Sequence, residues 1–151
     1  MGGEGFPALL ALARHRDCTD DPVVRQQLAD TYARERILVL MGERIRAALV
    51  AGRAPGPEGS VAKLATALLG RRSADLAMAM AGAGGQAWNT DDATGGEQAA
   101  TVLFVPMLGI AGGTSEIQRN IIGERVLGLP KEPVVDHDVP FRELTVGTQR
   151  S

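Results

Sequence analysis

The feature that most constrains the fold of this chain is a long run of helical periodicity that starts at Val23. From there to about Ala51 the sequence has no proline and a single glycine, and apolar residues recur every three or four positions. The polar turn before the run supplies Asp20 or Asp21 as N-cap and Pro22 as the first helical residue. The pattern predicts a helix of about seven turns or more. Its expected buried positions are Leu28, Thr31 or Tyr32, Leu38, Met41, Ile45 and Ala48 or Leu49.

A second long helix is predicted after a break that is rich in proline and glycine. It starts at about Glu58 or Ser60 and runs to Ala81, where a glycine run beginning at Gly82 ends it. The polar stretch from there to Gly96 is expected to be a surface loop. Because the connection between the two long helices is short, they should be antiparallel neighbours. The expected buried side carries Val61, Leu64, Leu68, Leu76 and Ala79 or Met80, and the expected solvated residues are Lys63, Arg71, Arg72 and Asp75.

Shorter helices are predicted on either side of this pair. Residues 5–14 form an amphipathic helix with Leu9, Leu12 and Ala13 in one stripe. The period of residues 97–108 fits a helix or a strand. No partner strand occurs elsewhere in the sequence, so a short helix that ends near proline 106 is predicted. The fold class is therefore all-α, an up-and-down helical bundle.

Composition and charge exclude several classes of function. The net charge is -2, and the basic residues are scattered among acidic ones, so neither nucleic acid nor an anionic membrane is an expected partner. No run approaches the roughly 18 apolar residues of a membrane span. The single Cys18 suits a reducing compartment, and a cytoplasmic location is expected. His15 and His137 have no partners at metal-ligand spacing, so no metal site is expected.

The core is expected to be weakly stabilised. Aromatic residues make up only 3% of the chain, whereas alanine and glycine are abundant. Small side chains let helices approach closely, but each buries little apolar area. A chain of this composition should depend on other subunits or domains for stability, and a homo-oligomer is expected.

The stretch at residues 109–130 reads GIAGGTSEIQRNIIGERVLGLP and has the signals of a capped helix. Gly112 and Gly113 free the backbone, Thr114 or Ser115 can cap the helix, and Ser115 with Gln118 fits a capping box. A small-residue loop that opens onto a helix N-terminus can receive an anion. The helix is expected to repeat apolar residues at Ile117, Ile121 and Val126 or Leu127 and to end at Gly128 and Pro130.

The sequence of residues 112–130 resembles the C-terminal signature of the acyl-CoA dehydrogenase family. The two long helices are similar to the second and third helices of that family's C-terminal four-helix domain, which shares FAD with a neighbouring subunit. The resemblance implies FAD as cofactor. It also implies FAD contacts at Gly82 and Gly84, near the adenine half, and at Gly113, Thr114 and Glu116 beside the signature turn. On physical grounds alone, the first glycine pair is a helix C-cap.

The chain also departs from the family pattern. Many members place the catalytic glutamate where this chain has Gly112, and glycine cannot remove a proton. Other members carry the base on the first helix of this domain, which should precede Gly5. No catalytic residue is therefore expected. The bundle is expected to span residues 1–130 without its first helix and to be followed by an extended tail at 131–151.

Two functions remain open from the sequence. The first is the C-terminal FAD-contacting and oligomerisation domain of an acyl-CoA dehydrogenase-like flavoprotein, whose parent reaction is the α,β-dehydrogenation of acyl-CoA thioesters. The second is a non-catalytic helical partner, or a truncated remnant, that stabilises another flavoprotein subunit. Either way, acyl-CoA should bind only together with the absent flavoprotein domains, and the isolated chain should be inactive.

Overall fold

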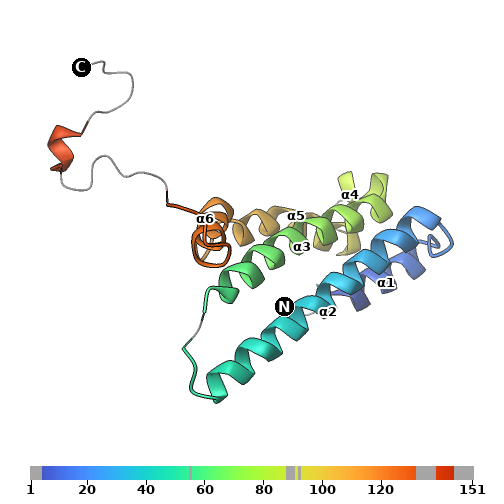
Figure 1. Cartoon of the computed structure of the whole chain (residues 1–151). Coiled ribbons are helices and arrows are strands. Elements are labelled where there is room, and N and C mark those ends of the chain that lie inside the picture. The colour runs from blue at the N-terminus through green and yellow to red at the C-terminus, as the bar shows by residue number, and fades with distance from the viewer. Residues whose placement is uncertain (1–4, 55, 88–90, 92, 132–138, 145–151) are drawn as a thin grey trace.

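The computed structural model describes residues 5–54, 56–87, 91, 93–131 and 139–144, and all regular secondary structure in them is helical (Figure 1). The predicted all-α fold class is confirmed, and residues 97–108 are helical as predicted. The elements are α1 Phe6–His15, α2 Pro22–Val50, α3 Glu58–Ala81, α4 Ala83–Gln86, α5 Ala93–Leu108, α6 Ser115–Arg125 and the 3-10 turn η1 Phe141–Glu143.

The α3 helix is the element on which the rest of the bundle packs. It contacts α1, α2, α4, α5 and α6, whereas α2 and α5 make no contact with each other in the described part of the chain. Figure 1 shows α6 near the N-terminal end of α3 and α4 at its C-terminal end. The bundle is therefore organised around one central helix and stays open between α2 and α5.

The open side of the bundle is a groove with a volume of about 920 Å³. Its walls come from α1, α3 and α5, with Glu35 of α2 at the margin. The lining is mostly apolar and includes Leu12, Leu69, Ala74, Phe104 and Val105.

The buried face of α3 is built largely from small residues, and this corrects the predicted face. Leu68 is 47% exposed, whereas its neighbour Leu69 is 9% exposed. The side that meets the other helices is a stripe of alanines with Gly70 at its centre, where a Cβ would lie 2.8 Å from Leu108 Cδ1 of α5. Of the predicted large residues Leu76 and Met80 are buried, whereas Leu68 is not, because the close approach in the middle of α3 is made by small residues. The buried alanines are Ala67, Ala74, Ala77 and Ala81.

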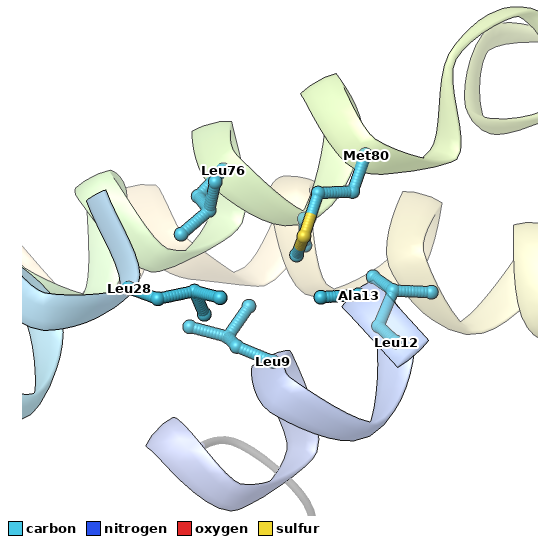
Figure 2. Packing of buried hydrophobic residues seen from close by; sticks show 7 residues of the cluster. Leu9, Leu12, Ala13, Leu28, Leu76 and Met80 are labelled. Carbon is cyan, nitrogen blue, oxygen red and sulfur yellow. The ribbon is translucent and has the colours of Figure 1, made fainter. Parts of the chain in front are cut away.

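One hydrophobic cluster joins the first three helices (Figure 2). The predicted stripe of α1 is confirmed, because Leu9, Leu12 and Ala13 are all buried and face α3. Leucine 28 of α2 enters the same cluster. The contribution of α3 to it is Leu76, Ala77 and Met80.

The start of α2 is capped as the sequence predicts. Of the two candidates Asp21 is the N-cap: its Oδ1 accepts the N–H groups of Val23 at 2.7 Å and Val24 at 3.2 Å. The predicted buried face holds only over the first half of the helix, where Leu28 and Thr31 are buried. Farther along, α2 has only α3 beside it, because α1 is short. The later predicted positions are half-buried at Leu38, Met41, Ile45 and Ala48.

Two predictions about the second half of the chain are wrong in part. The stretch expected to be a loop up to Gly96 contains α4, and α5 begins at Ala93, although residues 88–90 and 92 lie outside the described residues. The α5 helix also continues through Pro106 to Leu108. Of the predicted extended tail, residues 132–138 and 145–151 lie outside the described residues, and η1 is a helical turn within it.

Replacing a leucine of the cluster tests this packing. Leu76→Ala should lower the free energy of unfolding by about 3 kcal/mol, because it removes buried methyl groups and leaves a cavity. Leu68→Ala, on the exposed face of the same helix, should change it by less than about 0.5 kcal/mol. Urea unfolding followed by circular dichroism measures both, and equal losses would contradict this assignment of the α3 faces.

Candidate functional site

The signature turn before α6 is capped by Thr114. Its backbone is extended, with φ -62° and ψ 160°, and its Oγ1 accepts the N–H of Ile117 at 3.3 Å. Ser115 is instead the first helical residue, and its Oγ and N–H both donate to the carbonyl of Gly109. Of the two predicted N-caps, Thr114 is the one formed.

The predicted capping box between Ser115 and Gln118 is wrong. The Gln118 side chain is buried, and its Nε2 donates to the carbonyl of Gly112 at 2.9 Å. This bond satisfies the buried side-chain amide of Gln118, because a buried donor needs a partner. The apolar residues predicted for the buried face stay largely accessible, since Ile117 is 51% and Leu127 66% exposed.

Two glycines give the turn its shape. Gly112 has φ +69° and Gly113 has φ +94°, values that L side chains rarely adopt. A Cβ at position 113 would also lie 2.8 Å from Gln118 Nε2. The Gly113 carbonyl accepts a hydrogen bond from Lys63 of α3 at 2.5 Å. Position 113 therefore requires glycine for both its backbone conformation and the space beside it.

Thr114 and Glu116, two of the predicted FAD contacts, are coupled to each other. The backbone N–H of Glu116 lowers the pKa of its own carboxyl group most, followed by the Thr114 hydroxyl and then the Arg119 guanidinium. The Arg119 Nη1 lies 3.3 Å from Glu116 Oε1. The side chain of Glu116 remains 77% exposed, so its carboxylate is held in place and accessible. Such a carboxylate can accept a hydrogen bond from a ligand hydroxyl or N–H group.

The second predicted cluster lies where α3 ends. Gly82 has φ +59° and ψ -140°, which ends the helix and turns the chain into α4. Near Gly84 a Cβ would lie 3.8 Å from Arg16 Nη2, so the Arg16 guanidinium faces this turn. The Nε of Arg16 is buried and has no hydrogen-bond partner in the described part of the chain. A guanidinium beside a glycine turn can pair with an anionic group such as the diphosphate of FAD.

The two groups of predicted FAD contacts, at residues 113–116 and at residues 82–84, lie far apart. Lys63, which holds the signature turn, and Gly82 are separated by nineteen positions along α3. At the rise of an α-helix this corresponds to about 28 Å. The structure therefore brings Gly113, Thr114 and Glu116 together at one end of α3 and places Gly82 and Gly84 at the other end (Figure 1).

Three side chains of these clusters were not predicted from the sequence. Lys63 was expected in solvent but is half-buried, Arg16 carried no motif, and Gln118 was expected in a capping box with Ser115 and not at the Gly112 carbonyl. For Lys63 a signal existed, because it lies on the same helical face as Ala67, Gly70 and Ala74. Arg16 and Gln118 owe their roles to the glycines that they face, and those contacts depend on the fold.

Several other kinds of site are not formed by the described residues. No three His, Cys, Asp or Glu side chains gather there as a metal site would require. Gly112 places no side chain beside the signature turn, and nothing lies within 4 Å of a Cβ built on it. Within the same residues, none of the helices combines the length and the apolar composition that crossing a bilayer requires.

Removing the Thr114 hydroxyl tests the electrostatics of the turn. Thr114→Val should raise the pKa of Glu116 towards the ordinary glutamate value, but only in part, because the backbone N–H remains. Since the folded-state pKa is lowered, stabilisation by this carboxylate is present above the unfolded-state pKa and is lost as the pH falls through the folded-state value. Titration of the Glu116 carboxyl carbon by NMR measures the shift, and Thr114→Ser, which keeps the hydroxyl, should resemble the wild type.

Comparison with known proteins identifies the family. A family model described as acyl-CoA dehydrogenase, C-terminal domain, matches residues 4–127. The acyl-CoA dehydrogenase IpdE1 of Mycobacterium tuberculosis is 37% identical over 127 residues, and that of Mycolicibacterium smegmatis is 33% identical over 124 residues. No solved structure gives a significant match.

The extent of these matches defines which part of the relatives the chain resembles. Each match covers 82% of this chain but only 31% of the first relative and 30% of the second. The chain thus spans about a third of the length of the curated relatives that it matches. The helical bundle and the family model agree over nearly all of the described helices. The chain belongs to the acyl-CoA dehydrogenase family, and it corresponds to the C-terminal domain of that family.

Proposed function

We propose that this chain is the FAD-contacting and oligomerisation domain of an acyl-CoA dehydrogenase-like flavoprotein that dehydrogenates acyl-CoA thioesters. The observation that carries the proposal is the pair of glycine turns at the two ends of α3. Together these turns hold all five of the predicted FAD contacts. Each turn also presents polar groups that suit a dinucleotide.

The residues of each turn have a distinct task towards FAD. Arg16, beside Gly84, would neutralise negative charge on the diphosphate. Glu116 would accept hydrogen bonds from hydroxyl or N–H groups of the cofactor, and the Thr114 hydroxyl lies beside it. When bound, FAD supplies the acceptor for the hydride that leaves the β-carbon of the thioester.

The distance between the turns supports a shared cofactor. A single chain would hold one region of FAD at each end of a helix segment about 28 Å long. In the family that the chain belongs to, by the resemblance stated above, FAD is shared between neighbouring subunits. We therefore assign the two turns of one chain to two FAD molecules, each completed by a second subunit. An oligomer would then be required for a complete site.

The catalytic base must come from outside the described residues of this chain. Removal of the α-proton needs a carboxylate at the reacting carbon, and Gly112 supplies none. The acyl-CoA chamber is likewise assigned to the parts of the flavoprotein that this chain does not match. The same absence of a base supports the second function, a non-catalytic helical partner that completes another flavoprotein subunit. The single Cys18 is in keeping with a cytoplasmic location for either.

Titration with FAD tests the cofactor assignment. Adding FAD to the ¹⁵N-labelled chain should shift the amide signals of residues 82–84 and 113–116 more than those of the core, because these turns make the proposed contacts. Arg16→Gln should reduce the response at residues 82–84, whereas Arg14→Gln, an exposed change in the same helix, should leave it unchanged. A FAD response confined to other residues would contradict the proposal.

The accessible apolar residues support association. Leu103 of α5 is 80% exposed, and Leu127 after the signature helix is 66% exposed. Together with the groove beside α5, they leave apolar surface that a second subunit can cover.

The mass in solution tests this association. Light scattering at micromolar concentration should give a dimer or a higher oligomer, with the signature helix near the interface. Leu127→Asp should shift the mass towards the monomer, because it places a charge in that interface. Val23→Asp, at an exposed position at the start of α2, should leave the mass unchanged. A cooperative monomer in the wild type would contradict the association role.

A further inference from the structure

Carbonyl groups of the turn at residues 109–113 are held by side chains from two different helices. Two of the donors belong to α6 and fix the turn on the helix that it opens. The third belongs to α3 and lies fifty positions away in sequence, so it fixes the turn relative to the rest of the bundle. The pairs are Ser115 Oγ with Gly109 at 3.4 Å, Gln118 Nε2 with Gly112 at 2.9 Å, and Lys63 Nζ with Gly113 at 2.5 Å.

The Lys63 ammonium donates its hydrogen bond to the Gly113 carbonyl. In the described part of the chain no carboxylate pairs with it, although the side chain is half-buried. A hydrogen bond from a charged donor to a carbonyl is stronger than one between neutral groups. Removing the donor would leave the Gly113 carbonyl partly buried without its partner, which is costly.

The residue type at position 63 also fits the task. The chain has only two lysines, Lys63 and Lys131, and its other basic residues are arginines. An ammonium group is a compact single-point donor, whereas a guanidinium is a wide planar fork. The glycine turn offers one carbonyl at this point, which matches the smaller donor.

We infer that Lys63 is the positioning residue of the cofactor-contact turn. It fixes Gly113 relative to α3, and Thr114 follows directly in the chain, so Lys63 also places the Thr114 hydroxyl and the coupled Glu116 carboxylate. The inference rests on the proposed FAD contact of this turn and names the residue outside the signature that sets its position.

Amide hydrogen exchange of the full chain tests the placement without FAD. Lys63→Met should speed exchange of the Ser115 amide, which donates to Gly109, by about tenfold, because the turn loses its tie to α3. Lys63→Arg keeps a charged donor but replaces the compact ammonium with a planar fork, so it should restore exchange only in part, to between the values of Lys63→Met and the wild type. Lys131→Met, which changes the other, exposed lysine, should have no effect on this amide.

Titration with FAD then separates positioning from general stability. Lys63→Met should lower the FAD affinity, measured from the amide shifts of residues 113–116, at least about fivefold. In a Thr114→Val background the same change should lower the affinity by less than about twofold, because Lys63 acts through the placement of Thr114. A loss of stability alone would lower the affinity by the same factor in both backgrounds.

The results that would contradict the positioning role differ from those that would contradict the proposed FAD contact. Unchanged exchange at Ser115 in Lys63→Met, or the same loss of FAD affinity with and without Thr114→Val, would overturn the positioning role. A wild-type chain in which FAD moves neither turn would instead refute the proposed FAD contact, and the exchange measurement would still decide whether Lys63 places the turn.

Discussion

Close packing against the small-residue face of α3 is the interaction on which the rest of the structure depends. The other helices of the bundle reach one another mainly through α3, because α2 and α5 do not touch in the described residues. A glycine at position 70 lets Leu108 of α5 approach the α3 backbone, and the alanines around it allow similar proximity. Dispersion contacts are dense at such distances even though each side chain is small. A bulkier residue at position 70 would push α5 away and displace the turn that follows it.

The length of α3 sets the distance between the polar groups at its two ends. Each end of the helix meets a glycine turn, and each turn has a basic side chain from another element beside it. Lys63 reaches the turn before α6, and Arg16 of the α1 terminus faces the turn before α4. Glycine is needed at both places because the backbone has positive φ at Gly82 and Gly113. The α3 helix therefore sets the distance between two turns whose polar groups can bind an anion or form hydrogen bonds.

The residues described at the signature turn are suited to holding a ligand by contact, and Gly112 provides no carboxylate there. The polar groups near the signature are already engaged with each other, as Thr114 is with Glu116, and they act by position. Family membership and the extent of the matches agree with a domain that completes a site built with other parts of a flavoprotein. A carboxylate at position 112 would need a substrate chamber around it, and the described residues provide an open turn there.

The sequence by itself determined the features that depend on local backbone chemistry. Asp21 before Pro22, the glycines of the signature turn and the helical periods were readable because capping and positive φ involve only neighbouring residues. Tertiary structure alone decided that Leu69 is buried and Leu68 is exposed, since small residues give no hydrophobic signal for the face that they bring together. It also decided the bond from Lys63 to Gly113, because a contact across fifty positions forms only when α3 and α6 are packed.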